Sequence, residues 1–362
     1  MIEHVPFFSH NGLPNVVIDR IKEEISRIIA EESLIDGDSC RAFEKDFADY
    51  FGSGYCVGVG NGLDALTYSL RALNIGPGDK VAVPSHTFIA TWLSVLHVGA
   101  TPVGIDVNEL GQMDLNELEN HTGLRCVIPV HMHGFSVDMN RLMTWAKEKD
   151  IFVVEDCSQA HGLSIEGRLV GTWGDVGAFS FYPTKNLFAF GDAGAVLSAN
   201  QQIINSVRSL TRYGTKLGNK YVHEIVGFNS RLDTIQAGIV RIGLEHLDTW
   251  NRHRNTIAEK YRHNLSSSIR ILGELNTPGV YHHFIVFSKK RQELVSELNS
   301  LGIQTEVHYP RLASFELDES SKGRFPNAEL FAEEGISLPI SPWQTERQTE
   351  RVIEALNLKY RG

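Results

Sequence analysis

The stretch IFVVEDCSQAHG (151–162) decides the fold class, because a short apolar run ends there in acidic residues. Such a run is typical of a β-strand buried on both faces. Six more runs of this kind are separated by helical patterns: YCVGVG (55–60), KVAVPS (80–85), TPVGID (101–106), CVIPVH (126–131), VGAFSF (176–181) and GAVLSA (194–199). Strands that alternate with helices predict an α/β layered fold with a mostly parallel sheet.

The pattern changes after residue 233. The elements expected there are a long helix over about 234–265, a strand HHFIVF (282–287), a helix RQELVSELNSLG (291–302), a strand IQTEVHY (303–309) and a final helix from about 344. They predict a second, smaller α/β domain. We therefore expect a large domain over residues 1–245 and a small C-terminal domain over residues 246–362.

Composition excludes several classes of protein. The 362 residues are 42% hydrophobic with a net charge of -10, and no cluster of Lys and Arg suits nucleic acid. The start, MIEHVPFFSH, lacks the pattern of a signal peptide, and no apolar run reaches membrane-spanning length. The four cysteines lack a CxxC pair and predict neither a zinc site nor disulfides; they are Cys40, Cys56, Cys126 and Cys157. We expect a cytoplasmic protein without nucleic-acid or membrane partners.

Glycines mark a turn in VGVGNGLDAL (57–66), between an expected strand and an expected helix. Backbone N–H groups in such a turn bind phosphate at the helix N-terminus. A dinucleotide fingerprint would need a third glycine where Asp64 stands and an acid about 20 residues on, near Ala82. A phosphate site is therefore favoured over a dinucleotide site, although a plain tight turn also explains the glycines.

An acid and a lysine follow two of the apolar strands. Asp156 closes one strand, and Lys185 follows another within FSFYPTKNLFAFGDAGA (179–195). A lone acid at a strand end usually caps a turn, and a lone lysine is usually solvated. Together they suit pyridoxal 5′-phosphate (PLP), because a carboxylate keeps the pyridine nitrogen protonated and a desolvated lysine forms a Schiff base.

The chain resembles the DegT/DnrJ/EryC1/StrS family of PLP-dependent nucleotide-sugar aminotransferases over nearly its whole length. The resemblance is carried by RAFEKDFADYFG (41–52), NGLDAL (61–66), GPGDKVAVPSHTFIAT (76–91), GATPVGIDV (99–107), VIPVHMHG (127–134), EDCSQAHG (155–162), FSFYPTKN (179–186), GFNSRLD (227–233), VHYP (307–310) and ISLPI (336–340). It implies the aspartate aminotransferase-like fold (fold type I), with a three-layer large domain.

The resemblance also implies residue roles at the cofactor. Lys185 would be the Schiff-base lysine and the acid and base of the proton shift, and Asp156 would pair with the pyridine nitrogen. Gln159 would contact the ring hydroxyl side, and Phe88 would stack on the ring, although most phenylalanines are plain core residues. The phosphate would be held by Ser180 and by the amides of Gly62 and Leu63.

Further implied roles concern the partner subunit and the substrate. Asn229 would reach the partner's phosphate, which implies a homodimer with shared active sites; a turn-forming Asn would leave a monomer open. His308 and Tyr309, with Tyr182, would contact the sugar substrate. His133 and Phe135 replace residues commoner in the family, so the sugar pocket is expected to differ.

The form NGLDAL resembles the subgroup that aminates C3 of a dTDP-linked keto-6-deoxyhexose, with L-glutamate as donor, in deoxyamino-sugar synthesis such as that of lipopolysaccharide O-antigen. One alternative is a C4-aminotransferase on a UDP- or GDP-linked 4-keto sugar, and another is a transaminase of non-sugar substrates. Lys185 speaks against the family's dehydratases, which carry His at that position. A non-enzymatic regulator lacks support, since the lysine is present and no DNA-binding motif is visible.

Histidines and a cysteine near the strand ends raise the question of a metal. His131 and His133 alternate in sequence, and His161 lies four residues after Cys157. No third and fourth ligand with zinc-like spacing follows. We therefore expect no metal site.

Overall fold

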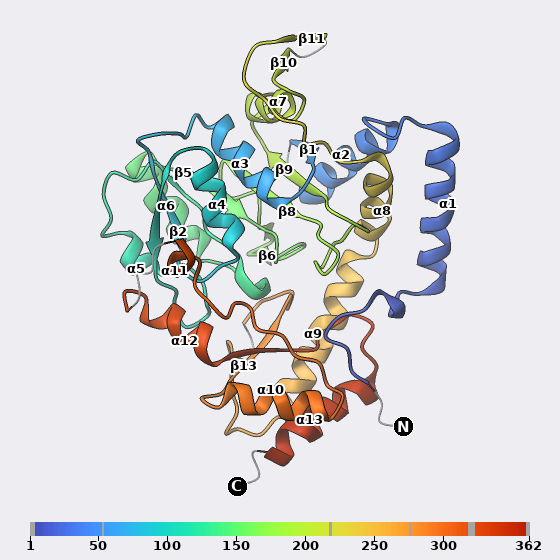
Figure 1. Ribbon diagram of the computed structural model, residues 1–362, viewed down its shortest axis with the longest axis vertical. Coiled ribbons are helices and arrows are strands. Elements are labelled where there is room, and N and C mark those ends of the chain that lie inside the picture. Colours follow the sequence, from blue (N-terminus) through green and yellow to red (C-terminus); the bar gives the residue numbers. More distant parts are fainter. Residues whose placement is uncertain (1–3, 53, 217–218, 275–276, 318–322, 360–362) are drawn as a thin grey trace.

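A seven-stranded sheet forms the centre of the computed structural model (Figure 1). The residues that the structure describes are 4–52, 54–216, 219–274, 277–317 and 323–359. The strands, in spatial order, are β1 (Tyr55–Val59), β9 (Gly194–Ser198), β8 (Val176–Ser180), β5 (Phe152–Asp156), β4 (Cys126–Val127), β2 (Lys80–Pro84) and β3 (Thr101–Ile105). Only β9 runs antiparallel to its neighbours in this sheet. The predicted mostly parallel sheet is confirmed.

Helices cover both faces of this sheet, which gives three layers. The covering helices are α2 (Asp38–Phe51), α3 (Gly62–Ala72), α4 (Ile89–His97), α6 (Met139–Lys149), α7 (Gln201–Leu210) and α8 (Thr234–Leu244). Alternate residues of one strand enter different cores: Val81 and Val83 pack with α3 and α4, whereas Ala82 packs with α6. Because side chains in a strand alternate between faces, an uninterrupted apolar run is what a doubly covered strand requires.

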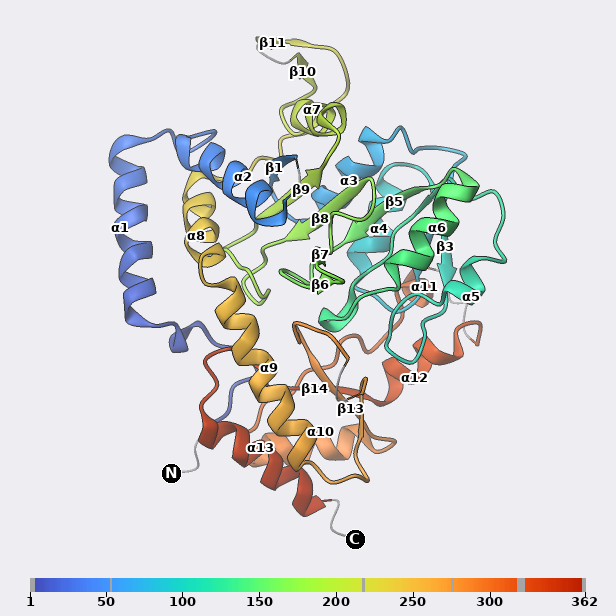
Figure 2. The ribbon, with the colours of Figure 1, turned by 180° about the vertical axis from the view of Figure 1, so that it is seen from behind.

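The chain leaves the large sheet along α9 (Leu247–Asn264) (Figure 2). The single long helix predicted over about 234–265 is wrong, because the chain forms two helices there, α8 and α9, which are separated at residues 245 and 246. A three-stranded antiparallel sheet follows, with β13 (Phe284–Phe287) between β12 (Arg270–Ile271) and β14 (Gly335–Leu338). Its helices are α10 (Arg291–Ser300), α11 (Ala313–Leu317), α12 (Pro326–Glu334) and α13 (Glu346–Lys359). The division into residues 1–245 and 246–362 stays a prediction, and its outermost residues, 1–3 and 360–362, lie outside the described ranges.

The strand predicted over 303–309 is wrong. Ile303 and Glu306 form only isolated bridges, with Val5 and Ser337. The segment lies beside β14, whose other edge pairs with β13, but it meets β14 only at the bridge between Glu306 and Ser337, so no ladder forms. It then bends, and residues 308 and 309 approach the large sheet.

Smaller elements complete the described chain. They are η1 (His10–Gly12), α1 (Asn15–Glu31), α5 (Leu115–Leu118), η2 (Met132–Gly134), β6 (Ser164–Ile165), β7 (Arg168–Leu169), β10 (Thr215–Lys216) and β11 (Asn219–His223). The hairpin of β10 and β11 projects beyond α7 in both views (Figures 1 and 2). Among the described helices, none combines the length and the apolar character needed to cross a bilayer.

Candidate active site

Lys185 lies in the loop after β8, where its backbone N–H donates to the carbonyl of Tyr182 at 2.9 Å. The residue keeps partial exposure to solvent. Burial nevertheless lowers the pKa of its amine from 10.5 to about 8, and the negative charge of Asp156 acts in the opposite direction. The structure therefore brings the two predicted catalytic residues within electrostatic reach.

Asp156 is the last residue of β5, at the carboxyl end of the parallel strands, where open α/β sheets bind ligands. Its carboxylate is held from two sides. The hydroxyl of Thr91 donates to Oδ2 at 3.1 Å, and the backbone N–H of Ser158 donates to Oδ1 at 3.1 Å. With only 5% of its surface exposed, the carboxylate is fixed in orientation beside the Lys185 loop.

The first turn of α3 lies against the end of β8. Asn61 caps the helix, and it accepts from the amides of Asp64 through its side chain and of Ala65 through its carbonyl. The amides of Gly62 and Leu63 find no acceptor in the described part of the chain, as is usual at helix N-termini. A Cβ on Gly62 would lie 2.6 Å from Cβ of Ser180, so only glycine allows this close approach. The free amides of Gly62 and Leu63 and the Ser180 hydroxyl thus form an anion-binding site, the anion cradle.

Gln159, Tyr309 and Phe88 form one wall of the site. The Gln159 side chain accepts from the His133 amide at 2.8 Å and donates to the Tyr309 hydroxyl at 3.2 Å. The Phe88 ring lies 5.5 Å from the Tyr309 ring, and 54% of Phe88 is exposed. Phe88 is therefore not the plain core residue that most phenylalanines are, and it remains free to meet a ligand.

A cavity of about 240 Å³ opens beside the Lys185 loop, and it contains two of the predicted substrate residues, Tyr182 and His308. The residues that line it are Phe7, Phe8, Tyr182, Thr184, Arg254, His282, His283, Glu306, His308, Ile340 and Ser341. The His283 and His308 rings stack with centroids 3.8 Å apart. Burial lowers the pKa of His308 to about 3 and that of His283 well below its usual value, so both are neutral at pH 7.

Asn229 lies apart from this cavity, at the base of the projecting hairpin. Its backbone bridges Arg212, and its side-chain oxygen accepts from Arg231 at 2.8 Å. The residue is exposed, and the predicted contact with a partner subunit stays a prediction.

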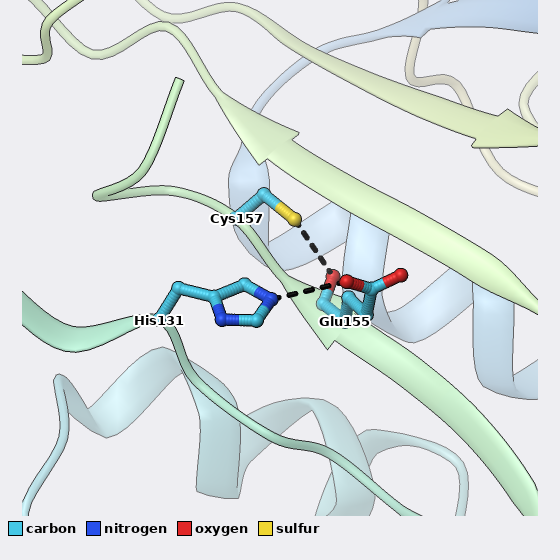
Figure 3. A group of neighbouring side chains, drawn as sticks. All are labelled: His131, Glu155 and Cys157. Carbon is cyan, nitrogen blue, oxygen red and sulfur yellow. Dashed lines mark hydrogen bonds and ion pairs between the residues drawn. The ribbon is translucent and has the colours of Figure 1, made fainter. Parts of the chain in front are cut away.

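His131, Glu155 and Cys157 bring three metal-type donor atoms together, all fully buried (Figure 3). The Glu155 carboxylate already accepts from His131 at 3.1 Å and from three backbone amides, those of Gly171, Trp173 and Gly174. Burial raises the pKa of Cys157 well above its usual value, which keeps the thiol protonated. The carboxylate's lone pairs are used within the fold, so this cluster anchors the strand ends and gives no support to a metal centre.

The residues of the site fit PLP. A partly desolvated amine lies near a fixed carboxylate, and a cradle of free amides lies next to Ser180. These are the three groups that a phosphorylated pyridine aldehyde needs: a nucleophile, a partner for the ring nitrogen and a phosphate site.

Several residues that contribute to the site were not predicted from the sequence. Thr91 orients Asp156, and His86 accepts from the Tyr309 amide at 3.1 Å. Both belong to SHTFIAT, directly after β2, so their place at a strand's carboxyl end was the available signal. His282 and Arg254 gave no such signal, because one lies in a predicted strand and the other in an ordinary charged helix.

Comparisons with known proteins agree with this geometry. A model of the DegT/DnrJ/EryC1/StrS aminotransferase family matches residues 16–357. A dTDP-3-amino-3,4,6-trideoxy-alpha-D-glucose transaminase of Streptomyces venezuelae is 40% identical, with 97% of this chain and 95% of the relative covered. A UDP-N-acetyl-3-dehydro-alpha-D-glucosamine 3-aminotransferase of Acidithiobacillus ferrooxidans is 37% identical, with 95% of each covered.

Two solved structures resemble this one over almost its whole length. The X-ray structure of DesV from S. venezuelae has a TM-score of 0.95 and 38% identity, and 99% of each chain is covered. The structure of NtdA from Bacillus subtilis, with bound cofactor PMP, has a TM-score of 0.92 and 28% identity, with 98% of this chain and 85% of that one covered. The predicted fold class is confirmed.

Proposed function

The chain belongs to the DegT/DnrJ/EryC1/StrS aminotransferase family, and from this premise we propose that it moves an amino group from L-glutamate to C3 of a dTDP-linked keto-6-deoxyhexose. It is a PLP-dependent transaminase that acts on a nucleotide-linked sugar. The donor, the nucleotide and the carbon that is aminated are the parts proposed here.

The observation that carries the proposal is that the Lys185 amine lies within electrostatic reach of the Asp156 carboxylate. PLP, when bound, supplies an aldehyde carbon for an amine and a ring that stores electron density. Lys185 would hold that carbon covalently and then carry the proton, since an amine with a pKa of about 8 exists in both forms near neutral pH. Asp156 would face the ring nitrogen, and the Gly62 and Leu63 amides with Ser180 would hold the phosphate.

Relatives support a C3-amino product. The S. venezuelae relative is named for a 3-amino sugar on dTDP, and the A. ferrooxidans relative for a 3-aminotransferase on UDP. The position of the amine is therefore better supported than the nucleotide. A C4-aminotransferase on a UDP- or GDP-linked sugar stays the second candidate. His308, Tyr309 and Tyr182 would contact the sugar, and a transaminase of non-sugar substrates has no comparable support.

A homodimer with shared active sites belongs to the same proposal. Tyr221 and Val226 in the region of the β10–β11 hairpin are 79% and 81% exposed, and Val16 and Ile29 on α1 are 67% and 62% exposed. Large apolar side chains on two protruding elements are typical of surfaces that a partner covers. Asn229, at the base of the hairpin, would then reach the partner's phosphate site. The location in the cytoplasm and a use in O-antigen synthesis remain predictions.

The test begins with the purified protein and added PLP. We expect a yellow protein in which borohydride fixes the cofactor on Lys185, located by mass spectrometry of peptides. Lys185→Ala should abolish transamination while the protein stays folded, because no other amine replaces the nucleophile. A panel of C3- and C4-keto nucleotide sugars, scored by loss of pyridoxamine absorbance, then identifies the acceptor. Labelling on another lysine, or turnover by Lys185→Ala, would contradict the assignment.

A further inference from the structure

Arg254 is a buried cation that forms no ion pair with any of the described residues. It lies in α9, only 2% of its surface is exposed, and it reaches the wall of the cavity beside Lys185. Its Nη1 donates to three backbone carbonyls, those of Tyr281, His282 and Ile340, at 3.3, 3.5 and 3.0 Å. Its Nε has no acceptor in the described chain. Buried charges are normally paired with an opposite charge, so this guanidinium lacks an anion that would normally accompany it.

A second donor without a partner lies next to it. Ser341 follows the carbonyl of Ile340 that Arg254 contacts, and it lines the same cavity. Its hydroxyl is buried and makes no hydrogen bond in the described chain. The Nε–H of Arg254 and the Ser341 hydroxyl both lack an acceptor in the described chain, and a carboxylate can accept from such donors.

The rest of the cavity wall favours an anion at this place. The lining histidines His282, His283 and His308 are neutral, because burial lowers the pKa of each far below neutral pH. Arg254 is therefore the single charged donor among the described lining residues. The lining carboxylate, Glu306, is exposed, so water screens its repulsion.

The volume of the cavity favours the smaller of the two substrates. The cavity holds about 240 Å³, which is below the roughly 300–1,000 Å³ usual for drug-sized ligands. It suits an amino acid better than a whole nucleotide sugar. Thr184, next to Lys185 in sequence, lines the cavity, and the charge of Lys185 contributes to the lowered pKa of the three lining histidines, so an amine bound here would lie within reach of the reacting residue.

We propose that Arg254 and Ser341 form the site for the carboxylate of the amino-acid donor. This rests on the proposed function, because a transaminase must bind an amino acid beside its lysine. Arg254 would bind the carboxylate by donating from Nε, while Nη1 keeps the backbone of residues 281, 282 and 340 in place.

The test compares Arg254→Met with Arg262→Met in the holoenzyme. Arg262 is a matched control, because it lies on the same helix and also donates to backbone carbonyls, those of Leu272 and Gly273, but does not line the cavity. We expect Arg254→Met to lower kcat/KM for L-glutamate about 10- to 100-fold, the range of a hydrogen bond to a charged group. The kcat/KM for the keto-sugar nucleotide should stay within about twofold in both variants, because it depends only on the half-reaction of the acceptor.

A donor without a carboxylate separates recognition from structure. A simple alkyl amine should react with wild type and Arg254→Met at rates within about threefold of each other, because the lost contact does not exist for it. If Arg254→Met lowers kcat/KM equally for the alkyl amine and for L-glutamate, the proposal is overturned. Glutarate gives a readout apart from catalysis: it should raise the Tm of wild type and of Arg262→Met, and not that of Arg254→Met.

If Arg254→Met does not fold, Ser341→Ala provides a second test of the same site. We expect it to raise the KM for L-glutamate about 3- to 10-fold, as for one neutral hydrogen bond. An unchanged KM would overturn the proposed site. Failure of the proposed function would give a different result from failure of the carboxylate site. In that case, L-glutamate would leave the absorbance of the cofactor unchanged even in the wild-type enzyme.

Discussion

At the residue scale, the chemistry depends on how burial and charge compete at Lys185. Burial disfavours the ammonium form and lowers the pKa, whereas Asp156 favours that form. Burial is the larger effect, so the pKa falls to about 8 instead of rising. A surface lysine would hold its proton throughout the physiological range and could not act as a nucleophile there.

The first prediction at this scale concerns pH. In the cofactor-free protein, reaction of Lys185 with an amine-specific reagent should rise with pH through a midpoint near 8, because only the neutral amine reacts. Asp156→Asn should move the midpoint to lower pH, since it removes the charge that favours the ammonium form. Peptide mass spectrometry at a series of pH values separates Lys185 from exposed lysines, whose midpoints should lie near 10.4. A midpoint for Lys185 among those of the exposed lysines would contradict the proposed desolvation.

Some residues of the site were predicted from the sequence, and others could not be. Lys185 and Asp156 were predicted because each follows an apolar strand and each matches a family motif. Arg254 gave no signal, since an arginine within NRHRNTIAEKYRHN (251–264) looks like any residue of a solvated helix face. Its burial depends on the chain segments around residues 281 and 340, which are distant in sequence.

At the element scale, the strands were predictable and one pairing was not. The inner strands of the large sheet are apolar runs, because helices cover both of their faces, whereas the edge strand β3 is only partly buried. The segment 303–309 carries an alternating pattern as well, yet it meets the small sheet only at the bridge between Glu306 and Ser337. Pairing depends on which edges other segments occupy, and that information is not local.

The junction of α3 with β8 supplies the prediction at this scale. Gly62→Ala should destabilise the protein by about 1–3 kcal/mol, because the added Cβ would lie 2.6 Å from Ser180 and the helix start would have to shift. The same shift should weaken PLP retention through the anion cradle. Helix propensity alone predicts the opposite sign, since alanine is favoured over glycine in helices by about 1 kcal/mol.

Gly76→Ala is the control for this comparison, because its Cβ would meet only the Val98 carbonyl at 3.6 Å. Chemical denaturation and the rate of PLP loss on dilution measure both effects. A stabilised Gly62→Ala protein with normal PLP retention would remove the proposed cradle.

At the scale of the whole molecule, two elements carry exposed apolar side chains that fit the proposed homodimer. The β10–β11 hairpin extends beyond α7 (Figure 1), and α1, which packs along α8, exposes Val16 and Ile29 among charged residues. Neither element covers the Lys185 site of its own chain. Asn229 does not line the cavity, and its neighbour Ser230 accepts from the Gly60 amide and donates to Asp64 near the start of α3. The family resemblance gives Asn229 a role at the partner's phosphate, and the proposed homodimer with shared sites would place it there.

Mixed dimers test this arrangement. If each site takes Lys185 from one chain and Asn229 from the other, a dimer of Lys185→Ala with Asn229→Ala has one intact site and one doubly altered site. Mixing the two variants at limiting PLP should then recover activity toward about a quarter of the wild-type value, since half of randomly paired dimers are mixed. A mixture of Lys185→Ala with Asp156→Asn is the control. Those residues are expected to come from the same chain, so no intact site forms and activity should stay at background. No recovery in the first mixture, despite isolated mixed dimers, would show that each chain completes its own site. Recovery in the control would show instead that Lys185 and Asp156 come from different chains.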